Sequence, residues 1–328
     1  MLKTNEIIGL GNALMDLLIE VDDNKLIEFN LKKGEMHLVE EEQAKQTLEK
    51  IHQHQLQIET VPGGSSANTL KAFSFLGGKA LLCGKVGTDP HGDIYIQEMQ
   101  NLGVGTRISK HNSITGHALT LITPDTERTF SVHLGAAIQL AKEDVLEEDI
   151  ANSKILHLEG YQLEGPTKET VLHAIQLAKK HNTLVSIDLA DPALIRRNKD
   201  LFKELTKDID IIFLNEEEAK EFTQLEPEEA LKEIAKSVKI VIVKLGIKGS
   251  LIYNNNQITK IDSVKAEAVD TTGAGDTFAA GFLYGFCQEW DMKKSGKLGS
   301  MLAAKVVEQI GVKINLLNLD EIKSYVLD

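Results

Sequence analysis

The chain has 328 residues, of which 42% are hydrophobic, so it can bury a large core as one big α/β domain or two smaller ones. Its 49 acidic and 36 basic residues give a net charge of −13, which argues against a nucleic-acid or anionic-membrane partner but not against a phosphate ligand. No apolar run approaches the ~20 residues of a membrane span, and the polar start shows no signal peptide. We therefore expect a cytoplasmic protein in which Cys83 and Cys287 are buried thiols.

Short β-type runs alternate along the chain with amphipathic helical runs. This alternation predicts an α/β fold in three layers, with a mostly parallel sheet and helices on both of its faces. In chain order we expect strand 7–10, helix 66–76, strand 80–86, helix 91–102, strand 155–158, helix 167–181, strands 184–189 and 209–214, helix 227–237, strand 240–245, a hairpin of 249–253 with 257–261, and helix 291–310.

Two stretches interrupt this alternation. Residues ~15–40 and ~106–134 are rich in β-type and turn residues and carry no long helical period. We expect them to pair as a small β sheet that projects from the main one as a lid over a site. The chain contains no repeat, low-complexity tract or Pro- or Gly-rich linker, so residues 1–328 are predicted to form a single domain with an inserted lid.

The first strand leads into a glycine-containing turn and then a carboxylate. The turn begins like a dinucleotide-binding fingerprint, but Leu14 stands where the third glycine belongs and a strand-like run follows, which disfavours a Rossmann dehydrogenase. Asp16 lies in an apolar neighbourhood, where a carboxylate needs partners. At the carboxyl edge of a parallel sheet it would accept hydrogen bonds from two adjacent sugar hydroxyls. An ordinary turn carboxylate is the alternative.

A diglycine precedes the second predicted element. Gly63 and Gly64 would let a ligand approach the backbone closely, or act as a hinge. Ser65 or Ser66 would be the N-cap of the helix, and Asn68 would offer its amide to a substrate hydroxyl. A glycine-rich helix start without a ligand explains these residues nearly as well.

Three further features lie on later elements. Asn215 and Glu218 follow an apolar strand, where they can form a reciprocal capping box and also hold the waters around Mg²⁺. Lys244 ends the next strand, and the glycines at positions 246 and 249 would bring backbone against a nucleotide or only shape a turn. Arg128 lies in the predicted lid, from which it could swing onto a phosphate, although an exposed strand arginine is the more common case.

The heptad Asp270-Thr-Thr-Gly-Ala-Gly-Asp276 precedes an amphipathic helix. The N–H groups around Gly273, Ala274 and Gly275 would face an anion at the positive end of the helix dipole. An acid at this point, Asp276, would accept a proton from a hydroxyl while the amides stabilise charge on a phosphoryl group. A capped helix after a glycine turn is the alternative, and a P-loop motif is absent from the sequence.

Taken in order over essentially the whole chain, these segments resemble the ribokinase-like carbohydrate kinases, also called the phosphofructokinase-B family. The matching segments are residues 11–16, 63–68, 215–218, 244–249 and 270–276. The N-terminal half is most similar to adenosine kinases, through residues 11–16, 31–39, 63–68, 127–130 and 134–137. Ribokinases themselves tend to carry a lysine where this chain has Ser65.

The resemblance implies a role for each matched residue. Asp276 would be the base, and Gly273, Ala274 and Gly275 the anion hole. Arg128 would help to neutralise the transferring phosphoryl group. Asn12, Asp16, Gly63, Gly64, Ser65 and Asn68 would hold or adjoin the ribose. Asn215 and Glu218 would organise Mg²⁺ through water, and Lys244, Gly246 and Gly249 would line the ATP site. Only 5% of the residues are aromatic, and Met36, Leu38 and Tyr161 are the candidates for a wall around the base.

The sequence therefore predicts an ATP- and Mg²⁺-dependent kinase for a primary hydroxyl, most similar in its motifs to enzymes that act on the 5′-hydroxyl of adenosine. A kinase for a ribose- or fructose-like sugar is the alternative, and a non-catalytic nucleotide-binding regulator is an alternative of another class. The resemblance leaves open activation by a monovalent cation. It is compatible with a monomer or a homodimer, and a lid of this length favours the monomer.

Overall fold

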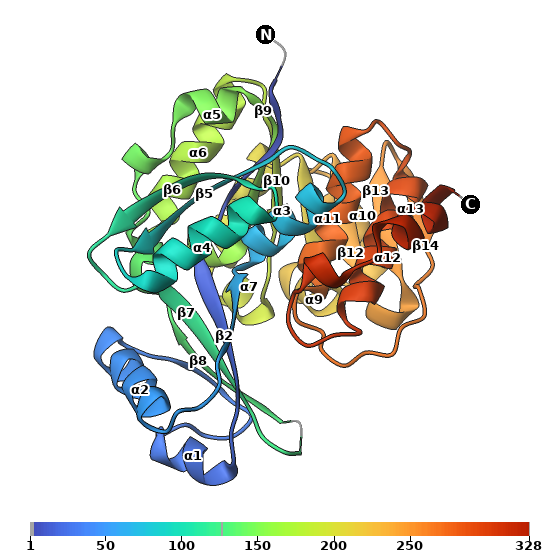
Figure 1. The fold of residues 1–328 in the computed structure, drawn as a ribbon. Helices are drawn as coiled ribbons and strands as arrows, with labels where there is room; N and C mark the ends of the chain where they lie inside the picture. The colour runs from blue at the N-terminus through green and yellow to red at the C-terminus, as the bar shows by residue number, and fades with distance from the viewer. Residues whose placement is uncertain (1–2, 126, 328) are drawn as a thin grey trace.

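The computed structural model describes residues 3–125 and 127–327, and within them the chain forms one sheet of nine strands and one of five (Figure 1). The large sheet has the order β14-β13-β12-β11-β10-β9-β1-β5-β6, and all its strands are parallel except the hairpin of β13 and β14. Its strands are β1 (Asn5–Leu10), β5 (Ala80–Gly87), β6 (Gly105–His111), β9 (Ser153–Glu159), β10 (Leu184–Asp188), β11 (Ile211–Asn215), β12 (Ile240–Lys244), β13 (Ser250–Asn254) and β14 (Gln257–Ile261).

Helices cover both faces of this sheet, because alternate strand residues are apolar on each side. Ile7 and Ile155 point into one core, whereas their neighbours Ile8 and Leu156 point into the other. The first face carries α3 (Ser65–Phe75), α4 (Pro90–Asn101), α11 (Ala274–Cys287) and α12 (Met292–Val306), with α13 (Leu319–Leu327) packed on α12. The second carries α5 (Glu147–Ala151), α6 (Lys168–Lys180), α7 (Pro192–Arg197), α8 (Lys199–Leu205), α9 (Glu216–Thr223) and α10 (Pro227–Ile234).

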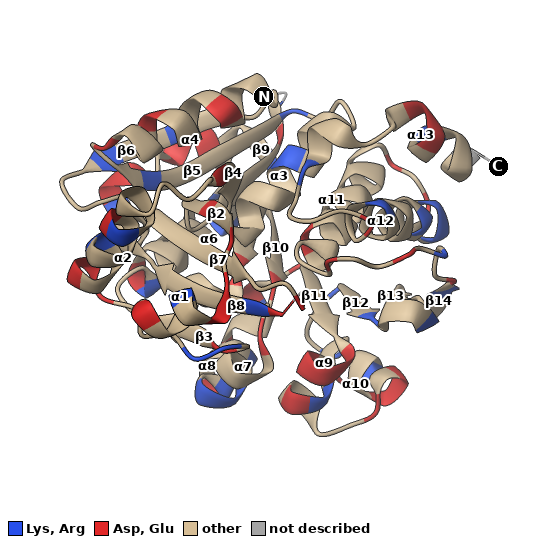
Figure 2. Ribbon diagram, turned by 60° about the horizontal axis from the view of Figure 1, so that its bottom comes forward, with Lys and Arg blue, Asp and Glu red and all other residues tan. Residues whose placement is uncertain are grey.

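The predicted three-layer fold and its elements are thus confirmed, with boundaries shifted by a few residues. Charged residues of both signs are interleaved over the outer helices in Figure 2. Across the described ranges, no helix combines the length and apolar character that crossing a membrane would require.

The small sheet has the order β3-β8-β7-β2-β4 and projects from the large sheet, with α1 (Asp23–Glu28) and α2 (Glu41–Gln53) at its far end (Figure 1). Its strands are β2 (Leu14–Glu20), β3 (Met36–Leu38), β4 (Glu59–Gly63), β7 (Gly116–Ile122) and β8 (Arg128–His133). The expected strand pairing between the two interrupting segments is present, since β2 pairs with β7 and β3 with β8.

The predicted boundaries of this sheet need two corrections. Residues 106–111 lie in β6, which pairs with β5 in the large sheet, so the second segment of the small sheet begins at Gly116. Strand β4 lies outside both predicted segments. A β-type run does not reveal which sheet it joins, and a strand that contains Pro62 is hard to recognise; it is tolerated because β4 is an edge strand.

The two faces of the small sheet differ in character because side chains alternate along each strand. Met15, Leu17 and Ile19 of β2 are buried in the core, together with Leu119 and Leu121 of β7. The opposite face carries Asp16 and the residues in register with it, and we call it the cavity face. In addition to Asp16 it presents Leu18, Val61, Ala118, Thr120, Phe130 and, on β3, Met36 and Leu38.

The helix that carries Asp276 is anchored by a buried aromatic residue. Phe282 of α11 is fully buried and meets the Phe213 ring edge-to-face at a centroid distance of 5.7 Å. We expect Phe282→Ala to lower the free energy of unfolding by about 3–5 kcal/mol, because it leaves a cavity between helix and sheet. Urea denaturation measures this change, with the exposed Ile27→Ala as control. A loss no larger than that of the control would contradict the assigned packing.

Candidate functional site

The site forms where the strand order of the large sheet reverses. From β1 the chain first builds β5 and β6 on one side and then β9 and β10 on the other, and in such sheets a crevice is expected at the carboxyl ends of the strands where the order reverses, here β1 and β9. Glu159 ends β9 and is buried there. Its carboxylate accepts the backbone N–H groups of Asn12 and Ser66, each at 2.9 Å. Burial raises the pKa of Glu159 to about 7 against the effect of these bonds.

Glu159 was not predicted from the sequence, and it fastens two predicted segments to each other. The signal that could have found it is an acidic residue at the carboxyl end of an otherwise apolar strand.

Asp276 lies in the first turn of α11, whose N-cap is Gly273 in a left-handed conformation (φ +75°). Within the described chain, no side chain caps this end, so Asp276 is not a helix cap. Its carboxylate instead accepts hydrogen bonds from Ser65 Oγ at 2.7 Å and Asn68 Nδ2 at 3.0 Å. Burial raises the pKa of Asp276, and these two donors partly offset the shift. A largely desolvated carboxylate therefore lies at the positive end of a helix, near the crevice.

The predicted serine cap of α3 is wrong. The N-cap is Gly64, at φ +94°, and Ser65 donates to Asp276 instead. Ser66 donates to the carbonyl of Leu10 at 2.8 Å. Because Gly64 takes the N-cap position, Ser65 and Ser66 lie inside the helix, and their hydroxyls donate to acceptors outside it.

Asp16 lies on the cavity face, against the diglycine. A Cβ at position 63 would collide with its carboxylate, and one at position 64 with the carbonyl oxygen of Asn12, so both positions require glycine. Burial raises the pKa of Asp16 to about 6, with Lys71 opposing the shift and Asp276 adding to it. In the described structure the Oδ1 atoms of Asn12 and Asn68 are buried without a hydrogen-bond partner. Unsatisfied acceptors beside a carboxylate suit a ligand with several hydroxyl donors.

A second cluster lies at the carboxyl ends of β10, β11 and β12. The Lys244 ammonium pairs with Asp188 at 2.5 Å, and a Cβ at Gly275 would lie only 2.9 Å from Lys244 Nζ. The predicted capping box is confirmed, since Asn215 and Glu218 bond reciprocally at 2.8 Å. Burial and the nearby Asp188 raise the pKa of Glu218. No group of three or more His, Cys, Asp or Glu residues suited to hold a metal occurs in the parts of the chain that the structure covers.

The loop after β12 contains the other two predicted nucleotide-site glycines. Gly246 opens a short 3₁₀ turn (Gly246–Lys248) with open space where its Cβ would be. Gly249, at φ +91°, would drive a Cβ into the carbonyl oxygen of Ile261, so it is needed for the turn itself.

Arg128 bridges the small sheet to the heptad. Its guanidinium pairs with Asp270, the first residue of the heptad, and donates to the carbonyl of Val269 at 3.4 Å. Asp270 also accepts the N–H groups of Thr272 at 2.9 Å and Gly311 at 2.8 Å. Arg128 is therefore engaged by the carboxylate of Asp270, whereas the sequence analysis assigns it to a phosphate.

A cavity of about 120 Å³ separates the cavity face from the heptad region. It is lined by Asp16, Leu18, Val61, Ala118, Thr120, Arg128, Phe130, Asp270, Thr272, Gly311 and Val312. None of the three predicted wall residues lines it: Met36 and Leu38 are each 72% exposed at the edge of the small sheet, and Tyr161 is 47% exposed. The aromatic side chain in this cavity is Phe130, which the sequence interpretation used only as part of a motif.

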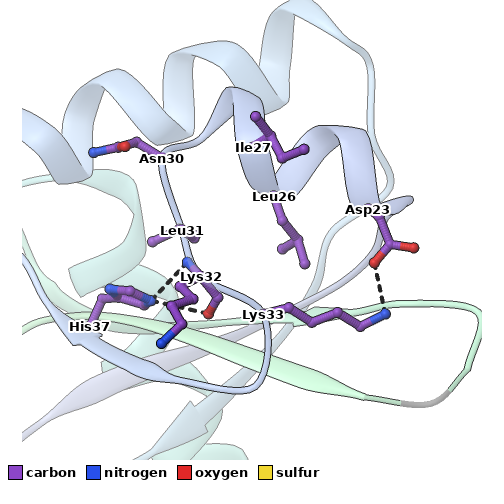
Figure 3. A pocket seen from close by; sticks show the side chains of 8 residues that line it. All are labelled: Asp23, Leu26, Ile27, Asn30, Leu31, Lys32, Lys33 and His37. Carbon is purple, nitrogen blue, oxygen red and sulfur yellow. Dashed lines mark hydrogen bonds and ion pairs between the residues drawn. The ribbon is translucent and has the colours of Figure 1, made fainter.

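A larger hollow of about 530 Å³ lies beside α1 and the segment that leads to β3 (Figure 3). Its two lysines already pair with carboxylates: Lys32 with Glu35, and Lys33 with Asp23 at 2.7 Å. Its residues belong to α1, the loop after it and β3, and none of the catalytic candidates lines it. We therefore assign the site to the crevice that contains Asp16 and Asp276.

A mostly parallel α/β sheet, a second small sheet and an acid in the first turn of a helix are features of the ribokinase-like class of small-molecule kinases, which the similar structures share. The family model of the pfkB family carbohydrate kinases matches residues 28–318. The chain therefore belongs to the pfkB family of carbohydrate kinases, and the resemblance of its motifs is confirmed.

Several relatives agree with this assignment. The chain is 29% identical over 282 residues to a 5-dehydro-2-deoxygluconokinase of Clostridium botulinum, covering 80% of this chain and 83% of the relative. A probable sugar kinase from Rhizobium etli matches with a TM-score of 0.86 and 32% identity, covering 99% and 98% of the two chains. The adenosine kinase from Sinorhizobium meliloti matches with a TM-score of 0.85 and 30% identity, covering 98% of each. The protein is a phosphotransferase that acts on a hydroxyl of a sugar or a nucleoside.

Proposed function

We propose that the protein phosphorylates the 5′-hydroxyl of a nucleoside, adenosine or a close relative, with ATP and Mg²⁺. The cavity beside Asp16 carries this proposal. It combines Asp16, a carboxylate free for substrate hydroxyls because the other lining carboxylate, Asp270, is paired with Arg128, with an apolar, partly aromatic lining of Leu18, Val61, Ala118, Phe130 and Val312. A nucleoside combines the same two kinds of surface, because it has ribose hydroxyls at one end and a flat base at the other. The likeness to an adenosine kinase at 30% identity supports the same substrate class.

In this proposal the polar groups of the crevice bind the ribose or take the proton. Asp16 accepts the ribose hydroxyls, and the free Oδ1 atoms of Asn12 and Asn68 are further acceptors. Asp276, held by Ser65 and Asn68, takes the proton of the 5′-hydroxyl as its oxygen attacks the γ-phosphorus of ATP, whose bond to the bridging oxygen breaks so that ADP leaves. The small sheet covers the substrate as a lid and excludes water.

The residues around the start of α11 fit a triphosphate. Gly275 leaves room beside the Lys244 ammonium, and the helix terminus adds its partial positive charge. Lys244, Gly246 and Gly249 would line the ATP site, and the amides of Gly273, Ala274 and Gly275 would form the anion hole. Arg128 would leave Asp270 for the transferring phosphoryl group, and Asn215 and Glu218 would hold Mg²⁺ through water. Bound MgATP supplies the phosphoryl group and a metal charge that offsets its negative charge.

A substrate panel tests the proposal. Nucleosides and sugars are offered separately with ATP and Mg²⁺, and ADP formation is followed. We expect turnover of adenosine or another nucleoside. The relatives named as sugar kinases favour a second candidate, a kinase for a sugar or sugar acid. Turnover of sugars alone would replace the nucleoside proposal by that candidate.

Phe130 gives a sharper test of the base site. We expect Phe130→Ala to raise the KM for the nucleoside about 10- to 100-fold, because it removes the aromatic surface that a base would contact. The matched control is Met36→Ala, a truncation on the same face but outside the cavity, which should leave KM nearly unchanged. Equal effects of the two substitutions would contradict the assignment of the cavity to the base.

A further inference from the structure

A buried lysine beside the substrate site has no role so far. Lys71 of α3 is 1% exposed, and its ammonium donates to the backbone carbonyl of Pro62. A neutral donor would satisfy one carbonyl, whereas burying an ammonium group is strongly unfavourable unless a negative charge compensates it. The charge of Lys71 therefore needs a reason beyond this hydrogen bond.

We propose that Lys71 is a positioning residue that keeps Asp16 ionised and, with Tyr95, holds the backbone of residues 62–64 against it. The substrate hydroxyls then meet a carboxylate in a fixed place. This inference rests on the proposed function only in assigning Asp16 to those hydroxyls.

The geometry of the backbone at residues 62–64, which we call the diglycine wall, supports the positioning role. Tyr95 of α4 is fully buried, and its hydroxyl donates to the carbonyl of Gly63 at 3.0 Å. Two consecutive carbonyls, those of Pro62 and Gly63, are thus held by buried side chains from two different helices. The Gly63 backbone lies so close to Asp16 that a Cβ would collide with its carboxylate. Any shift of this wall therefore moves the surface on which Asp16 rests.

The charges support the electrostatic role. Asp16 faces Asp276 of α11 and Asp270 before that helix, and both carboxylates raise its pKa, as burial does. Lys71 lowers the pKa of Asp16 and is the cation that opposes them. Arg128, which lines the cavity, pairs with Asp270.

The site contains a second lysine, Lys244, which is partly buried and acts on the other carboxylate. Lys244 is the cation that lowers the pKa of Asp276. Conversely, Asp16 is the group that most strongly raises the pKa of Lys71 against its burial. Tyr95 also faces Asp16 but is neutral, because its own pKa lies well above the ordinary value. Lys71 thus compensates Asp16, whereas Lys244 pairs with Asp188 and also acts on Asp276.

The consequence for the reaction is a change in affinity. An ionised Asp16 accepts hydrogen bonds from two hydroxyls, whereas its protonated form loses part of that capacity. Loss of the Lys71 charge raises the pKa of Asp16, so hydroxyl binding should fail at a higher pH. Asp276 remains beside Lys244, so kcat should change little.

Two substitutions separate the charge from the hydrogen bond. Lys71→Met removes both, whereas Tyr95→Phe removes only a hydrogen bond to the same wall. With the substrate that the wild type turns over, we expect Lys71→Met to raise KM and to move the acid limb of kcat/KM upward by about one pH unit. Tyr95→Phe should raise KM without moving that limb. An unmoved limb in a folded Lys71→Met protein overturns the proposal. If Lys71→Met does not fold, Lys71→Gln, which retains a donor for Pro62, takes its place.

A reciprocal measurement needs no substrate and no substitution of Lys71. In Asp16→Asn the pKa of the Lys71 ammonium, followed by NMR of ¹³Cε-labelled lysine, should fall relative to the wild type. An unchanged value overturns the inference. Because this experiment uses the ligand-free protein, its failure is distinguishable from failure of the proposed function, which would appear as a wild type inactive on the whole panel.

Discussion

Replacing Asp276 with Asn is expected to lower kcat by at least about 10³-fold, because the amide cannot take the proton of the attacking hydroxyl. Nucleoside binding should remain within a few-fold of the wild type, since Asp16 and the cavity face are unchanged. Steady-state kinetics with ATP and Mg²⁺ measure the first quantity, and isothermal titration calorimetry with the nucleoside measures the second.

The structure also indicates that this variant will fold. Ser65 can donate to the introduced amide oxygen as it does to Oδ1 of Asp276. Asn68 can turn its amide so that its unpaired Oδ1 accepts from the introduced NH₂ group. Burial disfavours the ionised form of Asp276, so a neutral isostere removes a cost. The control is Asp200→Asn on exposed α8, which should retain full activity. Wild-type turnover by Asp276→Asn would exclude Asp276 as the base.

The large sheet was predictable because its strands are buried on both faces and therefore appear as short apolar runs between helices. The strand β11, with Asn215 at its end, also revealed the capping box that starts α9. The small sheet was predicted only in outline. The residues of β6 do not indicate which of the two sheets this strand joins. Strand β4 was not predicted because it contains a proline, which is unusual in a strand.

A candidate site residue could be predicted where its type and its neighbours along the chain are enough to suggest a chemical role. Asp276 after two glycines is such a case, and the structure places it within hydrogen-bond distance of Ser65 and Asn68, which also come from a predicted segment. Glu159 and Lys71 were missed because their roles depend on what folds against them. Glu159 accepts a backbone N–H group that is distant in the sequence. Lys71 donates to the carbonyl of Pro62, in a strand that the sequence pattern does not reveal. Phe130 was missed as a wall residue because only the register of β8 shows that it shares a face with Asp16.

Asp16→Asn is expected to raise the KM for the nucleoside by about 100-fold, because charge-assisted hydrogen bonds to two hydroxyls are each worth about 1.5–3 kcal/mol. Steady-state kinetics under saturating ATP measure this change.

In the wild type KM should itself rise as the pH falls below about 6, where Asp16 takes up a proton. The variant should lose this acid limb. A KM that remains at the wild-type value would remove Asp16 from the substrate site.

The same substitution should stabilise the protein. The pKa of Asp16 is about 6 in the folded state and 3.8 as a free side chain, so the folded state binds the proton more tightly than the unfolded chain does. Above pH 6 the ionised carboxylate therefore costs stability, on the order of 1–3 kcal/mol, and Asn removes this cost. The pKa of about 6 already includes the attraction of Lys71, which lowers it. Thermal unfolding should show a higher Tm for Asp16→Asn at pH 7, with the difference vanishing as the pH falls toward 4. A lower Tm at pH 7 would show that Asp16 is a structural carboxylate, because a group held for substrate binding is the one whose removal favours the fold.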